Sequence, residues 1–158
     1  MIFVTLGTQK QQFTRLLEKV DNSKIFENEK IIVQVGNTKY ESNKMKIFDF
    51  MSIEEMKKYM NEAEFVITHG GVGSIIDALN LGKKVLACPR LKKYTEHVDD
   101  HQMEICKKLS EAGYIEQLLE EDSIEEKVEK LRKNEYKKYK NDEKYLEILE
   151  KDIEEFLK

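Results

Sequence analysis

The sequence predicts an α/β fold, a single Rossmann-like domain built on a parallel sheet. Short apolar runs of strand length alternate with segments whose apolar residues recur at helical spacing, and this alternation extends over most of the 158 residues. Glycines follow several of the predicted strands, which is typical of the turns at the carboxyl ends of parallel strands. At this length the chain corresponds to one domain with a sizeable core.

The amino-terminal part begins with a strand, a helix and a second strand. Residues 2–6 form an apolar run that predicts a strand, and a turn at residues 7–9 follows it. Apolar residues at helical spacing predict a helix over residues 13–20. Residues 31–35 predict the second strand, which ends at Gly36.

A short third strand and a capped helix come next. Residues 46–50 alternate between polar and apolar side chains, which predicts a strand. Ser52 is followed three residues later by Glu55, which forms a capping box. We therefore expect a helix from this point to about Asn61.

The second half of the chain continues the alternation. Residues 65–68 predict a buried strand, and the helix that follows it ends at Gly82. Residues 85–88 predict the next strand. A helix is expected from residue 99 or 100 to residue 112, and residues 114–115 predict a short last strand.

The most informative segment is a glycine cluster between the fourth predicted strand and its helix. Gly70, Gly71 and Gly73 lie where backbone N–H groups and the positive end of the helix dipole can face an anion such as a diphosphate. Asp77 lies one helical turn after Ser74, so its carboxylate can accept hydrogen bonds from sugar hydroxyls. The cluster matches neither the Walker motif nor the G-x-G-x-x-G fingerprint.

The composition excludes several classes of protein. Charged residues make up 37% of the chain, but the formal net charge is only −4 and Lys and Glu are interspersed, so no nucleic-acid partner is expected. The apolar runs are far shorter than the roughly 20 residues of a membrane helix, and no secretory signal pattern is present, so we expect a cytoplasmic protein. Cys88 and Cys106 lack metal-ligand spacing, and we expect both to be buried and no metal to be bound.

Two further segments have less specific patterns. Arg90, Lys92 and Lys93 follow the single proline, and we expect them in a solvated loop; the alternative is that they face phosphate or an anionic membrane surface. Glycine and proline are absent after residue 122, which divides the chain into a Rossmann-like domain over 1–122 and a helical extension over 123–158. One apolar stripe marks an amphipathic C-terminal helix, which can pack on its own domain or dock a partner: Leu146, Leu149, Ile153, Phe156 and Leu157.

The residues around the glycine cluster resemble a known family. The segments 68–77, 82–85 and 96–102, together with Pro89, are similar to the nucleotide-sugar-binding, C-terminal half of family 28 GT-B glycosyltransferases. Residues 1–8 and the short length resemble a narrower group, the separate catalytic subunits of two-component transferases. Members of that group act in dolichol-linked oligosaccharide synthesis and in bacterial capsule and exopolysaccharide synthesis. The resemblance covers residues 1 to about 115.

The resemblance implies roles for individual residues. Residues 70–74 would hold the diphosphate of a UDP-sugar without a metal, Asp77 its ribose, the backbone at Met51 its uracil and Gln102 the donor sugar. The catalytic residue stays unknown, with His69 and His97 as the candidates. The donor-binding set is Gly7, Thr8, Met51, His69, Gly70, Gly71, Gly73, Ser74, Asp77, His97 and Gln102.

The function implied by the resemblance is an inverting transferase subunit. It would move a hexose or N-acetylhexosamine from a UDP donor to a lipid-linked saccharide acceptor in polysaccharide biosynthesis. Because a complete GT-B enzyme has two Rossmann-like halves, the acceptor-binding half would be a membrane-anchored partner that holds this chain at the inner face of the membrane. The alternatives are a UDP-sugar epimerase, for which the chain is short, and a non-catalytic nucleotide-sugar-binding or regulatory module.

Overall fold

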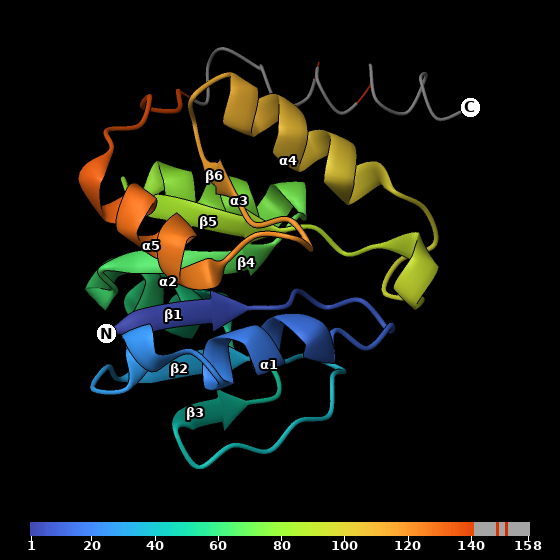
Figure 1. The fold of residues 1–158 in the computed structure, drawn as a ribbon, viewed down its shortest axis with the longest axis vertical. Coiled ribbons are helices and arrows are strands. Elements are labelled where there is room, and N and C mark those ends of the chain that lie inside the picture. The colour runs from blue at the N-terminus through green and yellow to red at the C-terminus, as the bar shows by residue number, and fades with distance from the viewer. Residues whose placement is uncertain (141–147, 149–150, 152–158) are drawn as a thin grey trace.

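One parallel sheet organises the chain. The computed structural model describes residues 1–140, 148 and 151. In this part six parallel strands pair in the order β3-β2-β1-β4-β5-β6 (Figure 1). The strands are β1 (Ile2–Thr5), β2 (Ile31–Gln34), β3 (Met45–Phe48), β4 (Phe65–His69), β5 (Lys84–Cys88) and β6 (Glu116–Gln117). The predicted α/β fold is confirmed.

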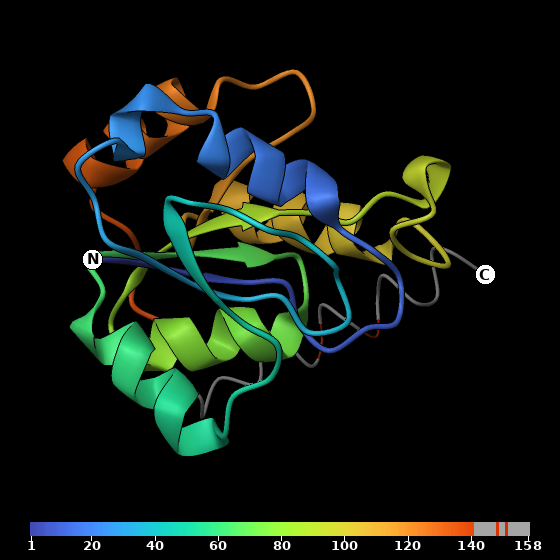
Figure 2. The same cartoon turned by 90° about the horizontal axis from the view of Figure 1, so that it is seen from below.

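Helices cover both faces of the sheet. They are α1 (Thr14–Asp21), α2 (Ile53–Glu62), α3 (Val72–Asn80), α4 (His101–Glu111) and α5 (Ile124–Lys133), with short 3-10 turns η1 (Lys24–Phe26) and η2 (Lys92–Tyr94). Figure 2 shows α1 and α5 on one side of the sheet and α2 and α3 on the other. The buried side chains of α4 join the apolar cluster of α2 and α3.

The sheet is buried on both faces, which explains its continuous apolar runs. In β1, Ile2 and Val4 pack in the cluster that also contains α1 and α5, whereas Phe3 packs in the opposite cluster. Successive side chains of a strand point to opposite faces, so a strand between two helical layers needs apolar residues at every position.

The strand order places a switch point beside β1. The chain runs outward from β1 to β2 and β3, then returns to add β4, β5 and β6 on the other side. The loops after β1 and β4 therefore leave the same edge of the sheet in opposite directions, and ligands of such folds bind in the crevice between them.

The last strand lies two residues later than the sequence predicts. Residues 114–115 are buried in the core, but the pairing with β5 places Glu116 opposite Leu86. The Tyr114 N–H donates to Leu109 O at 3.0 Å, so Tyr114 still closes the end of α4. Burial, and not strand pairing, accounts for the apolar character of these two residues.

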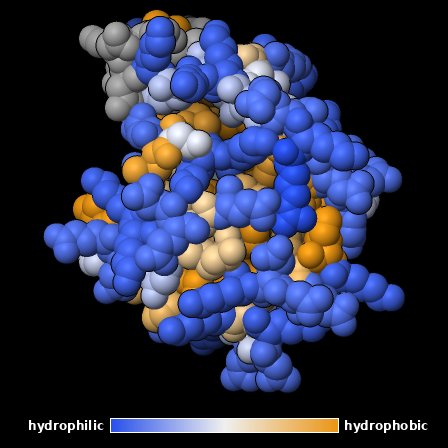
Figure 3. All heavy atoms as spheres, turned by 90° about the vertical axis from the view of Figure 1, so that its left-hand side faces the viewer, coloured by the Kyte–Doolittle hydropathy of each residue, from blue (hydrophilic) through white to orange (hydrophobic). Residues whose placement is uncertain are grey.

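The segment after residue 122 begins as part of the same core. Ile124, Val128 and Leu131 of α5 are buried in the cluster that contains α1. The predicted stripe from Leu146 to Leu157 lies outside the described residues. No helix in the described part of the chain is long and apolar enough to cross a bilayer. Seen from the edge where the strands begin, the surface is mostly hydrophilic, with apolar atoms between the polar side chains (Figure 3).

We expect Leu131→Ala to lower the free energy of unfolding by about 2–5 kcal/mol, the usual cost of a cavity in a core. Leu131 is fully buried, so truncating its side chain removes contacts in the core that water does not replace. Urea unfolding followed by circular dichroism measures the change. Lys133→Ala, an exposed position on the same helix, is the control and should change the stability by less than about 0.5 kcal/mol. Equal stability of the two variants would show that α5 is not part of the core.

Candidate functional site

Three segments that lie far apart in the sequence meet at the carboxyl edge of the sheet. The loop after β1 contributes Gln9, the turn after β4 contributes Gly70 and Gly71, and the loop before α4 contributes His97. Together they surround a hollow, which is lined by Gln9, Gly70, Gly71, Val72, His97, Asp99, His101 and Gln102. The hollow lies at the switch point between β1 and β4, where the fold class places ligands.

The first turn of α3 lacks a side-chain cap. Gly71 is the N-cap residue, and no acidic side chain lies in the first turn. By contrast, α2 and α5 each have a serine cap and two glutamates in the first turn. A Cβ added at Gly73 would meet no atom within 4 Å, so the space in front of this helix end is open. The first N–H groups of α3 are therefore available to an anion.

The ring of His69 fills the space between two glycine turns. A Cβ at Gly7 would lie 2.4 Å from His69 Nε2, and a Cβ at Gly71 would lie 2.2 Å from His69 Cε1. Gly7 also has a φ of +76°, which disfavours any other residue. These two glycines are thus required by close packing at the switch point.

The hydrogen-bond network assigns one tautomer to His69. Gln102 Oε1 accepts from the backbone N–H groups of Gly70, at 3.0 Å, and Arg90, at 3.1 Å, which fixes the orientation of the amide. Gln102 Nε2 then donates to His69 Nδ1 at 3.1 Å. The proton of the imidazole therefore resides on Nε2, which lies 3.3 Å from Ser74 Oγ.

His69 is suited to donate a hydrogen bond and not to act as a base. Burial, the charge of Arg90 and the neighbouring His97 lower its pKa to about 3, although the contact with Gln102 raises it. The ring is neutral at neutral pH, and its unprotonated nitrogen already accepts from Gln102. The structure thus provides a neutral N–H beside the glycine turn and no free lone pair there.

Gln102 lines the hollow, but its amide is occupied by hydrogen bonds within the chain. Its side chain is 2% exposed, and its amide bonds to Gly70, Arg90 and His69. In the structure this amide links the residues that follow β4 and β5, and the contact with the donor sugar that the resemblance implies stays a prediction.

His97 lines the hollow from the opposite side. Its Nε2 lies 3.1 Å from the amide nitrogen of Gln9, and its Nδ1 lies 3.1 Å from Asp99 Oδ1. The Asp99 N–H also donates to Nδ1 at 3.2 Å. His97 is therefore held by its own loop, with the Nε2 side directed toward the loop after β1.

The other predicted site residues are not among those that line the hollow. Asp77 is exposed on the face of α3 that also carries Gly73, four residues earlier. Thr8 is exposed, and its carbonyl accepts from Asn37 Nδ2 at 3.2 Å. The Met51 N–H donates to Gln34 Oε1 at 3.0 Å, so this backbone donor is occupied.

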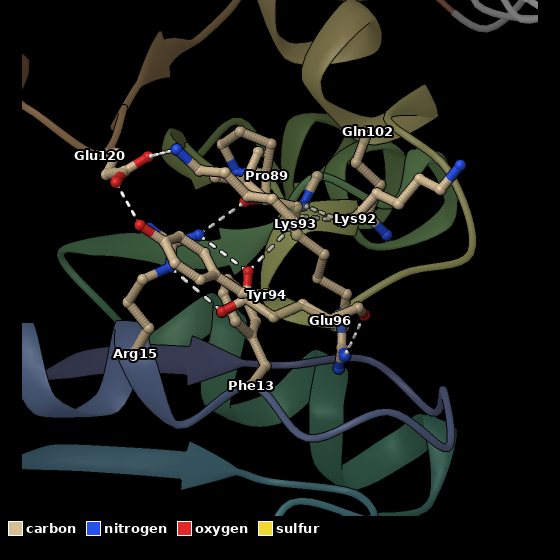
Figure 4. A network of polar contacts seen from close by, with 12 residues as sticks. Phe13, Arg15, Pro89, Lys92, Lys93, Tyr94, Glu96, Gln102 and Glu120 are labelled. Carbon is tan, nitrogen blue, oxygen red and sulfur yellow. Dashed lines mark hydrogen bonds and ion pairs between the residues drawn. The ribbon is translucent and has the colours of Figure 1, made fainter.

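Sequence reasoning missed a buried polar network beside the hollow. Arg15 of α1 donates two hydrogen bonds to the carboxylate of Glu96, at 3.1 and 3.0 Å, and Figure 4 shows the two side chains facing each other. Glu96 is 4% exposed. At the outer end of the network, Tyr94 donates to Glu120, which also pairs with Lys93. The pairing of residues 81 positions apart leaves no local signal in the sequence.

Arg90 corrects the expectation of a solvated basic loop. Its side chain is 0% exposed, whereas Lys92 and Lys93 are exposed as expected. The guanidinium donates to three backbone carbonyls and lies over the ring of Phe13, 5.0 Å from the centroid. Cys88 and Cys106 are buried free thiols, as predicted. Among the described residues, no group of three or more His, Cys, Asp or Glu is placed to hold a metal ion.

Comparison with known sequences identifies a matching family and several relatives. The glycosyltransferase family 28 C-terminal domain matches residues 1–156. The UDP-N-acetylglucosamine transferase subunit ALG13 of Saccharomyces cerevisiae is 32% identical over 75 residues. That match covers 47% of this chain and 35% of the yeast protein, so the chain spans about a third of the length of this relative.

Solved structures share the fold. The NMR structure of ALG13 superposes with a TM-score of 0.64 at 22% identity, and the match covers 94% of each chain. The glycotransferase of kitacinnamycin superposes with a TM-score of 0.62 at 13% identity. It matches 98% of this chain but only 39% of its own length, so the fold of this chain corresponds to one part of that larger protein.

The buried His69 predicts an acid-sensitive stability. Its pKa in the folded chain is lowered to about 3 from its ordinary 6.5, so the unfolded chain takes up a proton first as the pH falls. The contribution is complete above about pH 6.5 and is lost as the pH falls toward 3, which amounts to about 2 kcal/mol between pH 7 and pH 5. Urea unfolding at both pH values measures the difference. His69→Gln should lose that part of the slope, and identical slopes would contradict the burial of a neutral ring.

Proposed function

This chain belongs to glycosyltransferase family 28, and from this membership we propose that it is the donor-binding subunit of a two-component, inverting UDP-sugar transferase. It would transfer a hexose or N-acetylhexosamine to a lipid-linked saccharide acceptor. The single observation that carries the proposal is the uncapped first turn of α3, which opens beside His69 at the switch point of the sheet.

The chemistry of this turn fits a nucleoside diphosphate. A diphosphate leaving group gains negative charge as the bond to the anomeric carbon breaks. The N–H groups of α3 and the Ser74 hydroxyl are donors near one point, and the neutral Nε2–H of His69 donates to Ser74 Oγ and orients that hydroxyl. Fixed donors of this kind stabilise a developing anion by several kcal/mol without a metal ion. Asp77, on the exposed face of the same helix, is in a position to accept from ribose hydroxyls.

UDP-N-acetylglucosamine is the first donor to test. The yeast relative is a subunit of a transferase for that sugar. The Gly70 and Arg90 N–H groups donate to Gln102 at 3.0 and 3.1 Å, and these hydrogen bonds fix the position of the glycine turn. The surface that would contact the sugar also includes the loop of His97. The choice of sugar thus depends on the side chains of that loop.

The acceptor would be presented by a second polypeptide. The hollow is open, and the resemblance implies that the other half of a GT-B enzyme would face it. A donor on an open face reacts slowly, because water is not excluded and the acceptor hydroxyl is not oriented. We propose that a membrane-anchored partner supplies this half and holds the chain at the inner face of the membrane.

Asp77→Ala should weaken UDP binding by about 1–3 kcal/mol, the range for a lost hydrogen bond to a charged group. Isothermal titration with UDP in EDTA measures the affinity and also tests binding without a metal. Asn80→Ala, exposed at the far end of α3, is the control and should bind like the wild type. Wild-type binding that needs magnesium or manganese, or an Asp77→Ala variant with wild-type affinity, would contradict the assignment.

The isolated chain should transfer sugar poorly until its partner is added. The assay follows transfer from UDP-N-acetylglucosamine and other UDP-sugars to a polyprenyl-diphosphate saccharide, with and without the detergent-solubilised membrane fraction of the same cells. We expect activity only in the combined reaction. Full activity of the chain alone would refute the two-component proposal, and UDP binding with no transfer in either reaction would favour a non-catalytic module.

A further inference from the structure

The buried side chain of Arg90 links two of the loops around the hollow. Arg90 follows Pro89 after β5, and its guanidinium donates to three backbone carbonyls, two at the end of β1 and in the loop after it and one in the loop after β5. Nη2 donates to Leu6 O at 2.6 Å, and Nη1 donates to Gln11 O at 2.7 Å and to Glu96 O at 3.1 Å. Its backbone N–H donates to Gln102 Oε1, which also holds the glycine turn.

Each of these carbonyls belongs to a residue that lies one or two positions along the chain from a residue of the site. Leu6 precedes Gly7, against which the His69 ring packs. Gln11 follows Gln9 by two positions, and Glu96 precedes His97. Gln9 and His97 both line the hollow, and their side chains are in hydrogen-bond contact at 3.1 Å. One side chain therefore fixes the relative positions of the loops after β1 and β5.

The network around Arg90 indicates that geometry, and not a simple ion pair, is what this residue provides. The carboxylate of Glu96 accepts from Arg15 and from the Leu91 N–H, and only the backbone carbonyl of Glu96 accepts from Arg90. A buried cation held by neutral carbonyls is costly, so an apolar residue of similar volume would serve stability as well. Only a planar fork of donors reaches carbonyls on several sides at once.

Arg90 also places a fixed positive charge behind the glycine turn. Burial lowers the pKa of Arg90 to about 10, so the guanidinium is protonated at neutral pH. After burial, the positive charge of Arg90 contributes most to the lowered pKa of His69, so the electric field of the guanidinium reaches the glycine turn. A buried positive charge behind the glycine turn favours an anion in the hollow.

We propose that Arg90 is the positioning residue of the donor site, which holds the loops after β1 and β5 around the hollow and supplies positive potential to a bound diphosphate. This inference rests on the proposed function, since it presupposes a nucleoside diphosphate at the glycine turn. The substitutions Arg90→Met and Arg90→Lys separate the two contributions. Methionine fills space without charge or donors, whereas lysine retains the charge and loses the fork.

The test is the affinity for UDP at a temperature where circular dichroism shows every variant folded. Arg90→Met should bind UDP roughly ten- to hundredfold more weakly, the range for a misplaced binding group, and Arg90→Lys should fall between it and the wild type. Arg132→Met is the matched control, because Arg132 pairs with Glu64 away from the hollow. Leu131→Ala is the second control, because it destabilises the fold through the α5 core without touching the site.

The outcomes distinguish positioning from mere stability. If Leu131→Ala weakens UDP binding as much as Arg90→Met does, the role of Arg90 is structural and the inference is wrong. Wild-type affinity in Arg90→Met, or in Arg90→Lys if the methionine variant does not fold, would also overturn it. A wild-type chain that does not bind UDP would refute the proposed function instead. As an independent readout, NMR titration should show a higher His69 pKa in Arg90→Met and little change in Arg90→Lys.

Discussion

The contact of two glycine turns with one imidazole ring constrains the whole carboxyl edge of the sheet. Gly7 and Gly71 lie on either side of His69, and a Cβ on either residue would overlap the ring. This packing lies at the switch point, where the loops after the paired strands β1 and β4 diverge. It also buries the ring, and burial keeps the imidazole neutral. The neutral state of the His69 ring therefore depends on the absence of a Cβ at Gly7 and at Gly71.

Side-chain amides and guanidinium groups complete the backbone hydrogen bonds that end with the strands. Where parallel strands stop, their N–H and carbonyl groups lose the pairing of the ladder and need other partners. Gln102 accepts from Gly70 and Arg90, Gln34 accepts from Met51, and Arg90 donates to Leu6. The loops of the site are thus held by buried polar contacts, and their geometry is fixed before any ligand arrives.

The same edge leaves one set of donors open. The serine caps of α2 and α5 close their helix ends, while Gly71 leaves the first turn of α3 without a side-chain partner. An anion at this end would complete the hydrogen bonds of the helix beside Ser74, whose Oγ lies 3.3 Å from His69 Nε2. Polar side chains at this edge are thus hydrogen-bonded within the protein, whereas the first N–H groups of α3 have no side-chain partner. Fixed donors of this kind are what electrostatic stabilisation of a leaving group requires.

The sequence by itself determined the alternation of strands and helices, the parallel sheet and the glycine turn before α3, because these depend on local periodicity and on backbone conformation. It also carried the family resemblance. It misplaced β6, since burial of Tyr114 and Ile115 mimics a strand. Only the tertiary structure decided the tautomer of His69, the supporting position of Gln102 and the burial of Arg90. These depend on contacts between residues 33 and 84 positions apart, which no local pattern records, because an arginine after a proline looks the same whether water or three carbonyls receive its protons.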